Sequence, residues 1–112
     1  MSNNNFKKID SNAVKEIRAI KGIFRKTLVH NNKIMMIKFR LEKDSDLPIH
    51  SHHHYQMGYI ISGKLKFIVN GKEEILKGGD SYIIDTDINH GVKVLENSVV
   101  IDIFTPPRED YL

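Results

Sequence analysis

A chain of 112 residues is long enough for one ordinary domain and too short for two. Its 40% hydrophobic and 28% charged residues are typical of a soluble globular protein, and no apolar run approaches the roughly 18 residues that a membrane helix needs. The absence of cysteine excludes disulfide bonds and thiol chemistry, so any metal ion would be held by nitrogen and oxygen ligands.

The formal net charge of +3 conceals an uneven distribution along the chain. Residues 1–43 carry 11 Lys and Arg against 3 acidic residues, whereas residues 44–112 carry 6 against 11. The basic residues are spread singly among apolar ones, without the basic helix or aromatic series that is typical of nucleic-acid binding. We therefore expect no nucleic-acid partner, and interpret these charges as a solvated face or as pairing with the acidic half.

The first segment, residues 1–12, is rich in Asn and Ser and is expected to be flexible, ahead of a single domain over residues 13–112. It lacks the apolar stretch of a signal peptide, so we expect a cytoplasmic protein without membrane association. Only residues 13–20 could sustain a helical period. From Ile17 onward the chain reads as a series of short β segments.

Turn residues separate these β segments. Asn70-Gly71 is the strongest hairpin signal, because both positions tolerate the positive φ of a type I′ turn. Further turns are predicted at Ser62-Gly63 and at Gly78-Gly79-Asp80. The predicted strands are Ile34–Leu41, Tyr59–Ile61, Lys64–Val69, Lys72–Leu76, Tyr82–Ile84, Gly91–Leu95 and Val99–Phe104. Many short strands with regular turns predict an all-β antiparallel sandwich or barrel.

A histidine cluster lies in the middle of the chain, where residues 50–54 read His-Ser-His-His-His. Alternate side chains share one face of a strand, so His50 and His52 would point the same way, about 6–7 Å apart. Two imidazoles so placed can bind one metal ion, with nitrogen–metal distances of about 2.1 Å. Gln56, four residues after His52, would lie on the same face and can add an amide oxygen as a further ligand of the ion. The alternative is a solvated polar turn.

His90 is the candidate for a third imidazole. It follows the turn at Gly78-Gly79-Asp80 and the predicted strand Tyr82–Ile84, and a barrel can bring such a position beside an earlier strand. Taken alone, His90 has the alternative of a hydrogen-bonded histidine in the core or at the rim of the barrel.

The spacing of these residues resembles the two motifs of the cupin family. In the first motif, His-x-His is followed after three residues by Glu and after six more by Gly; the matching residues are His50, His52, Gln56 and Gly63. In the second motif, Gly is followed after five residues by Pro-x-Gly and after two more by His; the matching residues are Gly79, Asp85-Thr86-Asp87 and His90.

The resemblance implies a single-domain cupin, which is a double-stranded β-helix or jelly-roll barrel, with its motifs at 50–63 and 79–94. It also implies one divalent metal ion. Three imidazoles and an amide suit Zn, Ni, Co, Mn or Fe. The expected metal ligands are His50, His52, Gln56 and His90.

The motifs also depart from the family pattern. The Gly that opens the first motif is missing, and Asp85 and Asp87 replace the Pro and Gly of the second, which bears on turn geometry. Gln56 replaces the usual Glu and brings no charge. The full 2+ charge of the ion is then uncompensated, so the site should attract an anionic substrate such as a carboxylate. The same change weakens the analogy to redox cupins.

The C-terminal tail carries a second group of candidate site residues. Asp102 and Phe104 share one strand face, and an aspartate between apolar neighbours is unusual unless it faces a cavity or a partner; the alternative is a solvated strand end. Arg108 follows two prolines, and its ordinary interpretation is a surface arginine.

The end of the chain, from Asp102 to Leu112, resembles that of the small pectin-degradation (KdgF-type) cupins, as does the stretch from His50 to Gln56. Those proteins convert 4,5-unsaturated monouronates, released from pectin or alginate, into linear ketonised sugars by ring opening, an isomerase-type reaction. The resemblance implies that Asp102, Phe104 and Arg108 line a site for a small sugar acid.

For this reaction we expect Asp102 to act as general acid and base and Arg108 to hold the substrate by bidentate hydrogen bonds. Phe104 would shape the pocket. Tyr59 and Tyr82 are further candidates for substrate binding, although packing is the commoner role for either. We expect His53 and His54 to be solvated, with His54 able to support a metal ligand.

Two other functions stay open at this stage. One is a different metal-dependent cupin enzyme, a dioxygenase or a sugar isomerase; the other is a non-catalytic module that binds a sugar acid. We also expect a homodimer, because a barrel of this size leaves strand edges that need cover, with residues 13–43 the main contributors.

Overall fold

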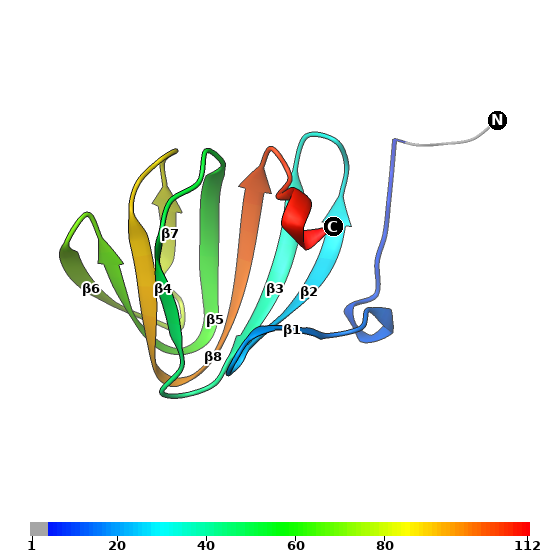
Figure 1. The fold of residues 1–112 in the computed structure, drawn as a ribbon. Coiled ribbons are helices and arrows are strands. Elements are labelled where there is room, and N and C mark those ends of the chain that lie inside the picture. Colours follow the sequence, from blue (N-terminus) through cyan, green and yellow to red (C-terminus); the bar gives the residue numbers. More distant parts are fainter. Residues whose placement is uncertain (1–4) are drawn as a thin grey trace.

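The computed structural model describes residues 5–112 as an antiparallel β structure (Figure 1). Two short 3₁₀ helices, η1 and η2, lie near the two ends of this range. The elements in chain order are η1 (Ser11–Ala13), β1 (Ile17–Ile20), β2 (Ile23–His30), β3 (Met35–Leu41), β4 (Asp46–His50), β5 (Tyr55–Val69), β6 (Lys72–Lys77), β7 (Ser81–Ile84), β8 (His90–Thr105) and η2 (Glu109–Tyr111). Within these residues, no helix is long and apolar enough to cross a membrane.

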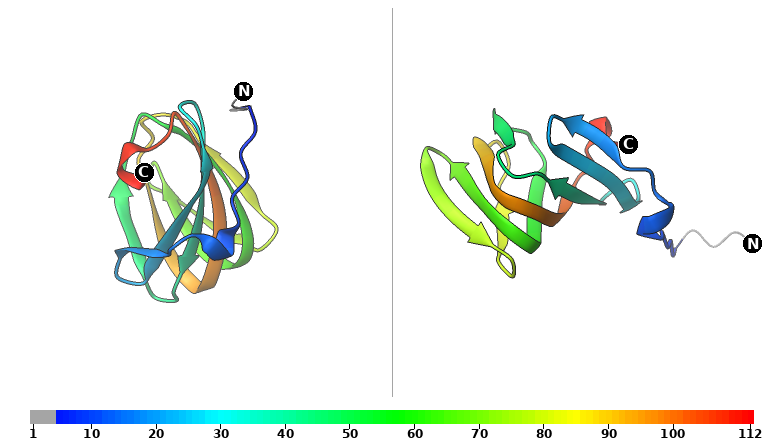
Figure 2. Two further views of the ribbon diagram at one scale, coloured as in Figure 1. Left: turned by 90° about the vertical axis from the view of Figure 1, so that its right-hand side faces the viewer. Right: turned by 90° about the horizontal axis from the view of Figure 1, so that it is seen from below.

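Two long strands, β5 and β8, organise the barrel. The sheet order is β1-β2-β3-β8-β5-β6, while β4 pairs with β8 and β7 pairs with β5. Both long strands curve at one end of the molecule and pass from one side of the barrel to the other (Figure 1). Seen at right angles to that view, the strands surround a common interior (Figure 2). This is the jelly-roll barrel that the sequence predicts.

The bend in β5 corrects one prediction. Ser62-Gly63 is not a hairpin turn but an irregular stretch inside a single strand, where the register against β8 shifts. Gly63 has φ of 101°, and a Cβ there would lie 2.0 Å from the Ser98 Oγ. Only glycine fits at this corner. The strands predicted at Gly91–Leu95 and Val99–Phe104 are likewise two parts of one strand, β8.

The hairpin at Asn70-Gly71 is confirmed. Val69 faces Lys72 across the two-residue loop, so β5 leads directly into β6. Asn70 and Gly71 have φ of 49° and 80°, as a type I′ turn requires.

Residues 13–20, the one window that could sustain a helical period, do not form an α-helix. Asp10 caps the short helix η1 by accepting a hydrogen bond from the Asn12 N–H, and the chain then extends into β1. Lys26 donates to the Ser11 carbonyl at 2.9 Å and Arg40 pairs with Glu16 at 2.7 Å. Contacts with β2 and β3 therefore determine the conformation of this segment. The flexible segment expected over residues 1–12 stays a prediction, and residues 1–4 lie outside the described part of the chain.

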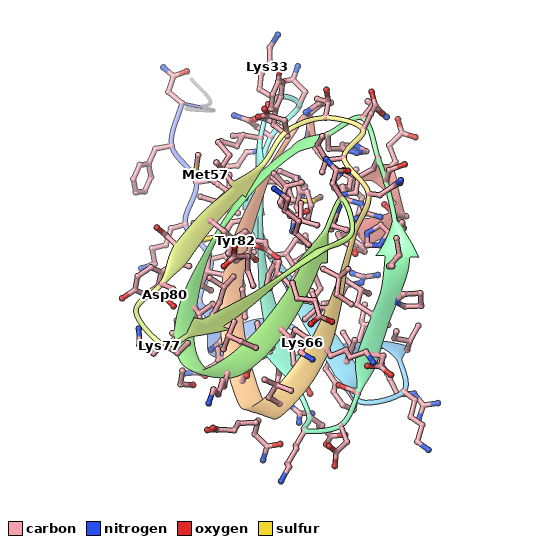
Figure 3. All side chains as sticks on the ribbon, turned by 90° about the vertical axis from the view of Figure 1, so that its left-hand side faces the viewer. Lys33, Met57, Lys66, Lys77, Asp80 and Tyr82 are labelled. Atoms are coloured by element: carbon pink, nitrogen blue, oxygen red, sulfur yellow. The ribbon has the colours of Figure 1, made fainter. Side chains whose placement is uncertain are left out.

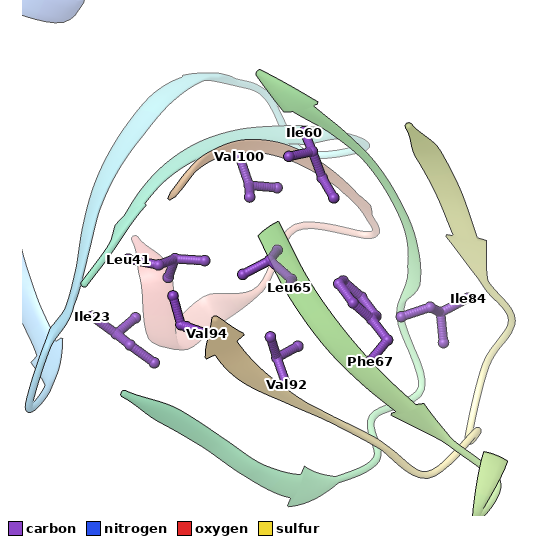
Figure 4. Packing of buried hydrophobic residues seen from close by; sticks show 9 residues of the cluster. All are labelled: Ile23, Leu41, Ile60, Leu65, Phe67, Ile84, Val92, Val94 and Val100. Atoms are coloured by element: carbon purple, nitrogen blue, oxygen red, sulfur yellow. The ribbon is translucent and has the colours of Figure 1, made fainter. Parts of the chain in front are cut away.

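The main hydrophobic core lies between the strands in the barrel interior (Figure 4). A smaller cluster of Met35, Ile37 and Phe104 lies under the C-terminal tail, against Phe39 and Tyr111. The main core consists of Ile23, Leu41, Ile60, Leu65, Phe67, Ile84, Val92, Val94 and Val100. The rest of the barrel interior holds the polar side chains of the candidate site, among them Gln56, His90 and Asp102.

Candidate metal centre and substrate pocket

Three histidines converge at one end of the barrel. His50 ends β4 and lies directly opposite His90, which begins β8. His52 lies in the short connection that leads to β5, where its carbonyl accepts a hydrogen bond from the Asp87 N–H at 2.8 Å. One ring nitrogen from each histidine lies within 4.8 Å of the others. The predicted grouping of these three residues is therefore present.

Hydrogen bonds to main-chain carbonyls indicate which ring nitrogen of each of the three imidazoles carries a proton. In each ring Nδ1 faces a main-chain carbonyl oxygen, which can only accept, so Nδ1 carries the proton and Nε2 keeps its lone pair. Such a bond is the usual support of a metal-ligating histidine. The pairs are His50 with Pro48 at 2.8 Å, His52 with His54 at 3.2 Å, and His90 with Ile88 at 2.8 Å.

Gln56 completes the donor set. Its Oε1 lies 3.2 Å from the His52 Nε2, so two atoms with free lone pairs face each other. Burial, with smaller contributions from the charges of Arg108, His90 and His50, lowers the pKa of His52 to about 4, although the contact with Gln56 opposes this shift, so the imidazole is neutral at neutral pH. Three imidazole nitrogens and one amide oxygen around a common point fit a divalent transition-metal ion.

A tyrosine–aspartate pair lies deeper in the same interior. Tyr82 on β7 donates a short hydrogen bond to the Asp102 Oδ1 on β8, and Asp102 is only 4% exposed. Burial raises the pKa of Asp102 to about 7, although hydrogen bonds from Tyr82 and Gln56 and the charge of Arg108 oppose this rise. Burial also raises the pKa of Tyr82 well above its usual value. The aspartate can therefore bind or release a proton near neutral pH.

Gly58 makes this pair possible, and the sequence analysis missed it. It lies between the two residues in the sheet, opposite Tyr82 on one side and Asp102 on the other. A Cβ at this position would lie 2.2 Å from the Asp102 Oδ1 and 2.3 Å from the Tyr82 Oη. The signal was present in the sequence, because an isolated glycine inside a strand marks a close approach of other groups.

Arg108 lies at the edge of the pocket, held by the tail. Its guanidinium lies 4.4 Å from the ring centre of Tyr111 and 5.4 Å from that of Phe104. Its Nε and Nη2 donate to the two carboxylate oxygens of Asp110 at 3.2 and 2.9 Å. The Asp110 carboxylate therefore occupies the side of the guanidinium formed by Nε and Nη2.

One continuous cavity joins these groups. Its polar part is lined by the metal-ligand candidates His50, Gln56 and His90, and by Asp102 and Arg108. Tyr82, Phe104 and Tyr111 form aromatic walls, and side chains of the main core line the rest of the cavity. The structure thus brings together every residue predicted for the site except Tyr59.

Tyr59 lies on the outer face of β5. It is 50% exposed, because the alternation that turns Gln56 and Ile60 inward turns Tyr59 outward. The expectation that Tyr59 lines the substrate site does not fit this placement. His53 is exposed, whereas His54 is partly buried and supports His52 through its main-chain carbonyl.

Comparisons with known proteins agree with the fold. The family model described as "Cupin domain" matches residues 37–104, and the chain belongs to the cupin family. Within that family it is 37% identical over 93 residues to the pectin degradation protein KdgF of Dickeya dadantii (strain 3937), covering 81% of this chain and 84% of that protein.

Two solved structures share the whole architecture. KdgF from Halomonas sp. superposes with a TM-score of 0.91 at 27% identity, covering 96% of this chain and 100% of the other. An RmlC-like cupin from Shewanella frigidimarina NCIMB 400 also gives a TM-score of 0.91, at 26% identity, covering 96% and 97%. The chain is therefore a small single-domain cupin that resembles the KdgF proteins, as its motifs predict.

Proposed function

We propose that this protein is a metal-dependent cupin enzyme that opens the ring of 4,5-unsaturated monouronates from pectin or alginate, giving linear ketonised sugars. The similarity to KdgF, a pectin degradation protein, supports this substrate class. The observation that carries the proposal is the buried Asp102, which shares one cavity with His50 and His90 of the histidine cluster and with Arg108. Simple binding of a sugar acid does not need a buried carboxyl that titrates near neutral pH.

The reaction requires one proton to leave and one to be delivered. The substrate is a cyclic hemiacetal with a double bond between C4 and C5 and a carboxylate on C5. Loss of the proton from the C1 hydroxyl forms the C1 carbonyl as the bond from C1 to the ring oxygen breaks. The electron pair of that bond gives an enolate at C5, and protonation at C4 yields the C5 ketone. No oxidant and no second substrate is needed.

His50, His52, Gln56 and His90 are the residues that would hold the metal ion. When bound, such an ion supplies Lewis-acid stabilisation of negative charge on the carboxylate and the enolate oxygen. Because Gln56 is neutral, the four ligands leave the charge of the ion available to an anionic substrate.

Asp102 is the proposed acid and base. With a pKa of about 7, it is present in both protonation states near neutral pH, so that it can accept the proton of the C1 hydroxyl and donate one to C4. Proton transfer by a positioned side chain is typically worth about 10²–10⁴ in rate. Tyr82 orients the carboxyl through its hydrogen bond.

Arg108 and Phe104 would position the substrate. The N–H groups of Arg108 that Asp110 does not use can donate to the carboxylate or to a hydroxyl. Phe104 is 1% exposed, with its ring centre 5.9 Å from that of His52, so it forms an apolar wall beside the metal ligands. This wall would keep water away from the enolate.

The test follows unsaturated galacturonate by NMR, with metal-loaded protein and with buffer alone, since the substrate also opens spontaneously. The proposal expects the linear ketone to appear faster with the protein. Ligand signals that broaden without faster consumption would instead identify a sugar-acid-binding module. Turnover of another substrate that depends on iron and oxygen would identify a dioxygenase.

A further inference from the structure

Strand β2 carries two polar residues on its inward face. Arg25 and Thr27 follow the buried Ile23 at alternate positions, and they lie opposite Phe39 and Ile37 of β3, whose side chains pack inside the barrel. Directly opposed residues of paired strands project from the same face of the sheet. Neither polar residue is among those that line the cavity of the candidate site. An arginine and a threonine at inward positions need polar partners, because an unpaired polar group there is costly.

The C-terminal helix η2 supplies these partners. It lies over β2 and β3 (Figure 1). The Thr27 Oγ1 donates to the Tyr111 carbonyl at 2.5 Å. The Nη1 and Nη2 of Arg25 donate to the carbonyls of Tyr111 and Asp110, each at 3.4 Å. The last carbonyls of a helix lack partners within the helix, so these two side chains attach η2 to the strand.

The same helix determines where Arg108 points. Asp110 accepts hydrogen bonds from the Nε and Nη2 of Arg108, and the ring centre of Tyr111 lies 4.4 Å from its guanidinium. Arg108 lines the interior of the barrel, into which Tyr82 points from β7 (Figure 3). Direct contacts therefore run from β2 through Asp110 and Tyr111 to the guanidinium at the edge of the candidate site.

We propose that Arg25 and Thr27 are positioning residues for Arg108, which they hold at the cavity by attaching η2 to the barrel. This inference rests on the proposed function, in which Arg108 binds the carboxylate or a hydroxyl of the substrate. A two-point arginine contact needs the guanidinium in one place and one orientation. Loss of either attachment therefore weakens substrate binding and leaves Asp102, the proposed acid and base, in place.

The first measurement determines kcat and KM of metal-loaded variants with unsaturated galacturonate. Thr27→Val keeps the shape of the side chain but removes the hydroxyl, and Arg25→Met removes the guanidinium. Each should raise KM about tenfold and leave kcat within about twofold of the wild type. Thr27→Ser restores the hydroxyl and should restore KM. Arg40→Met is the matched control, because Arg40 also stacks on a ring, that of Phe24 at 4.1 Å, but from the exposed side of β3, and it should leave KM unchanged.

Combination with Arg108→Ala separates positioning from a general loss of stability. A residue that acts through Arg108 has nothing left to position once this guanidinium is gone. Arg25→Met and Thr27→Val should therefore cause no further rise of KM in the Arg108→Ala protein. Increases that multiply would overturn the proposal, and so would an unchanged KM in both single variants. Circular dichroism verifies that each variant is folded.

NMR of the zinc-loaded protein tests the same contacts without any substrate. The Nε–H of Arg108 donates to Asp110 in the wild type, so its proton should exchange slowly with water. Exchange should be at least about tenfold faster in Arg25→Met and Thr27→Val and unchanged in Arg40→Met. Equal rates in all four proteins would overturn the proposal. A wild type that does not turn over unsaturated galacturonate would contradict the proposed function alone, and the exchange rates would still decide whether β2 positions Arg108.

Discussion

At the scale of single residues, Gly58 controls the geometry of the proposed acid and base. Any side chain at this position collides with Asp102 and Tyr82, whose atoms would lie 2.2 and 2.3 Å from the new Cβ. We expect Gly58→Ala to displace the carboxyl and lower kcat by about 10²-fold, within the range that proton transfer contributes. It should also destabilise the protein by about 1–3 kcal/mol through overpacking.

The measurement compares kcat and the free energy of unfolding of Gly58→Ala with those of Gly78→Ala. At Gly78 a Cβ would lie 3.3 Å from main-chain atoms of Ile61 and Ser62, so this control should lose some stability, but it should keep kcat because Gly78 is not among the residues that line the cavity. Equal losses of kcat in the two variants would contradict the positioning role of Gly58.

Asp102 links the stability of the metal-free protein to pH. Its pKa is raised by burial from 3.8 to about 7, so the folded protein binds this proton more tightly than the unfolded chain does. The resulting stability is fully present below about pH 4 and is lost as the pH rises through about 7. Asp102→Asn removes this dependence, and above about pH 8 it should be the more stable protein, by up to about 4 kcal/mol.

Urea unfolding of both proteins at a series of pH values checks this expectation, with the metal removed throughout. The difference in free energy of unfolding between wild type and Asp102→Asn should grow from about pH 4 to about pH 8. A difference that does not vary with pH would mean that Asp102 ionises as an exposed carboxyl does.

Gln56 sets the charge of the site. Gln56→Glu keeps an oxygen ligand but adds a negative charge close to both the metal site and Asp102, with which Gln56 forms a hydrogen bond. We expect the variant to retain metal and to raise KM for an unsaturated uronate at least about tenfold, because like charges a few ångströms apart cost on the order of 1–4 kcal/mol. Steady-state kinetics together with metal analysis test this. An unchanged KM would show that the charge of the site does not select the substrate.

At the scale of elements, the sequence predicts local features better than strand length. The Asn70-Gly71 hairpin follows from the backbone preferences of two residues, and the spacing of His50, His52 and His90 indicates their convergence. The continuity of β5 was missed because Ser62-Gly63 looks like a turn. Only the register of β5 against β8, which depends on long-range pairing, shows that the chain bends there without reversing.

The same limit applies to the site. The spacing of Asp102 and Phe104 within one strand predicts that their side chains lie on the same face. Their role in the site was inferred from the resemblance to the KdgF-type cupins. The pairing of Tyr82 with Asp102 depends on both flanking Gly58 in the folded sheet, and no pattern within either strand contains that information. Tyr59 was assigned to the site without regard to its parity, which is opposite to that of Gln56.

The corner of β5 gives a prediction at this scale. Gly63→Ala would both adopt an unfavourable φ and push a Cβ to within 2.0 Å of the Ser98 Oγ, whereas Gly71→Ala has an unfavourable φ of 80° but open space around it. We expect Gly63→Ala to be the more destabilising, by roughly 2 kcal/mol or more. Thermal unfolding of both variants measures this. Equal losses would mean that the corner is not closely packed.

At the scale of the whole molecule, the two faces of the same strands have different roles. The inner faces of β5, β7 and β8 carry Gln56, Tyr82 and Asp102, whereas the outer faces of β5 and β7 carry exposed apolar side chains such as Met57 and Ile83. The barrel therefore combines a cavity that holds the candidate site with a partly apolar outer wall.

The most direct test of the proposed activity follows the ultraviolet absorbance of the ring alkene in freshly prepared unsaturated galacturonate. Metal-loaded wild type should accelerate its decay well beyond the rate in buffer. Metal-stripped wild type and metal-loaded Asp102→Asn should both decay at close to the buffer rate, and metal should restore the first but not the second. A wild type that matches buffer in the presence of every candidate metal would contradict the proposed ring opening, while leaving the cupin fold and the histidine cluster in place.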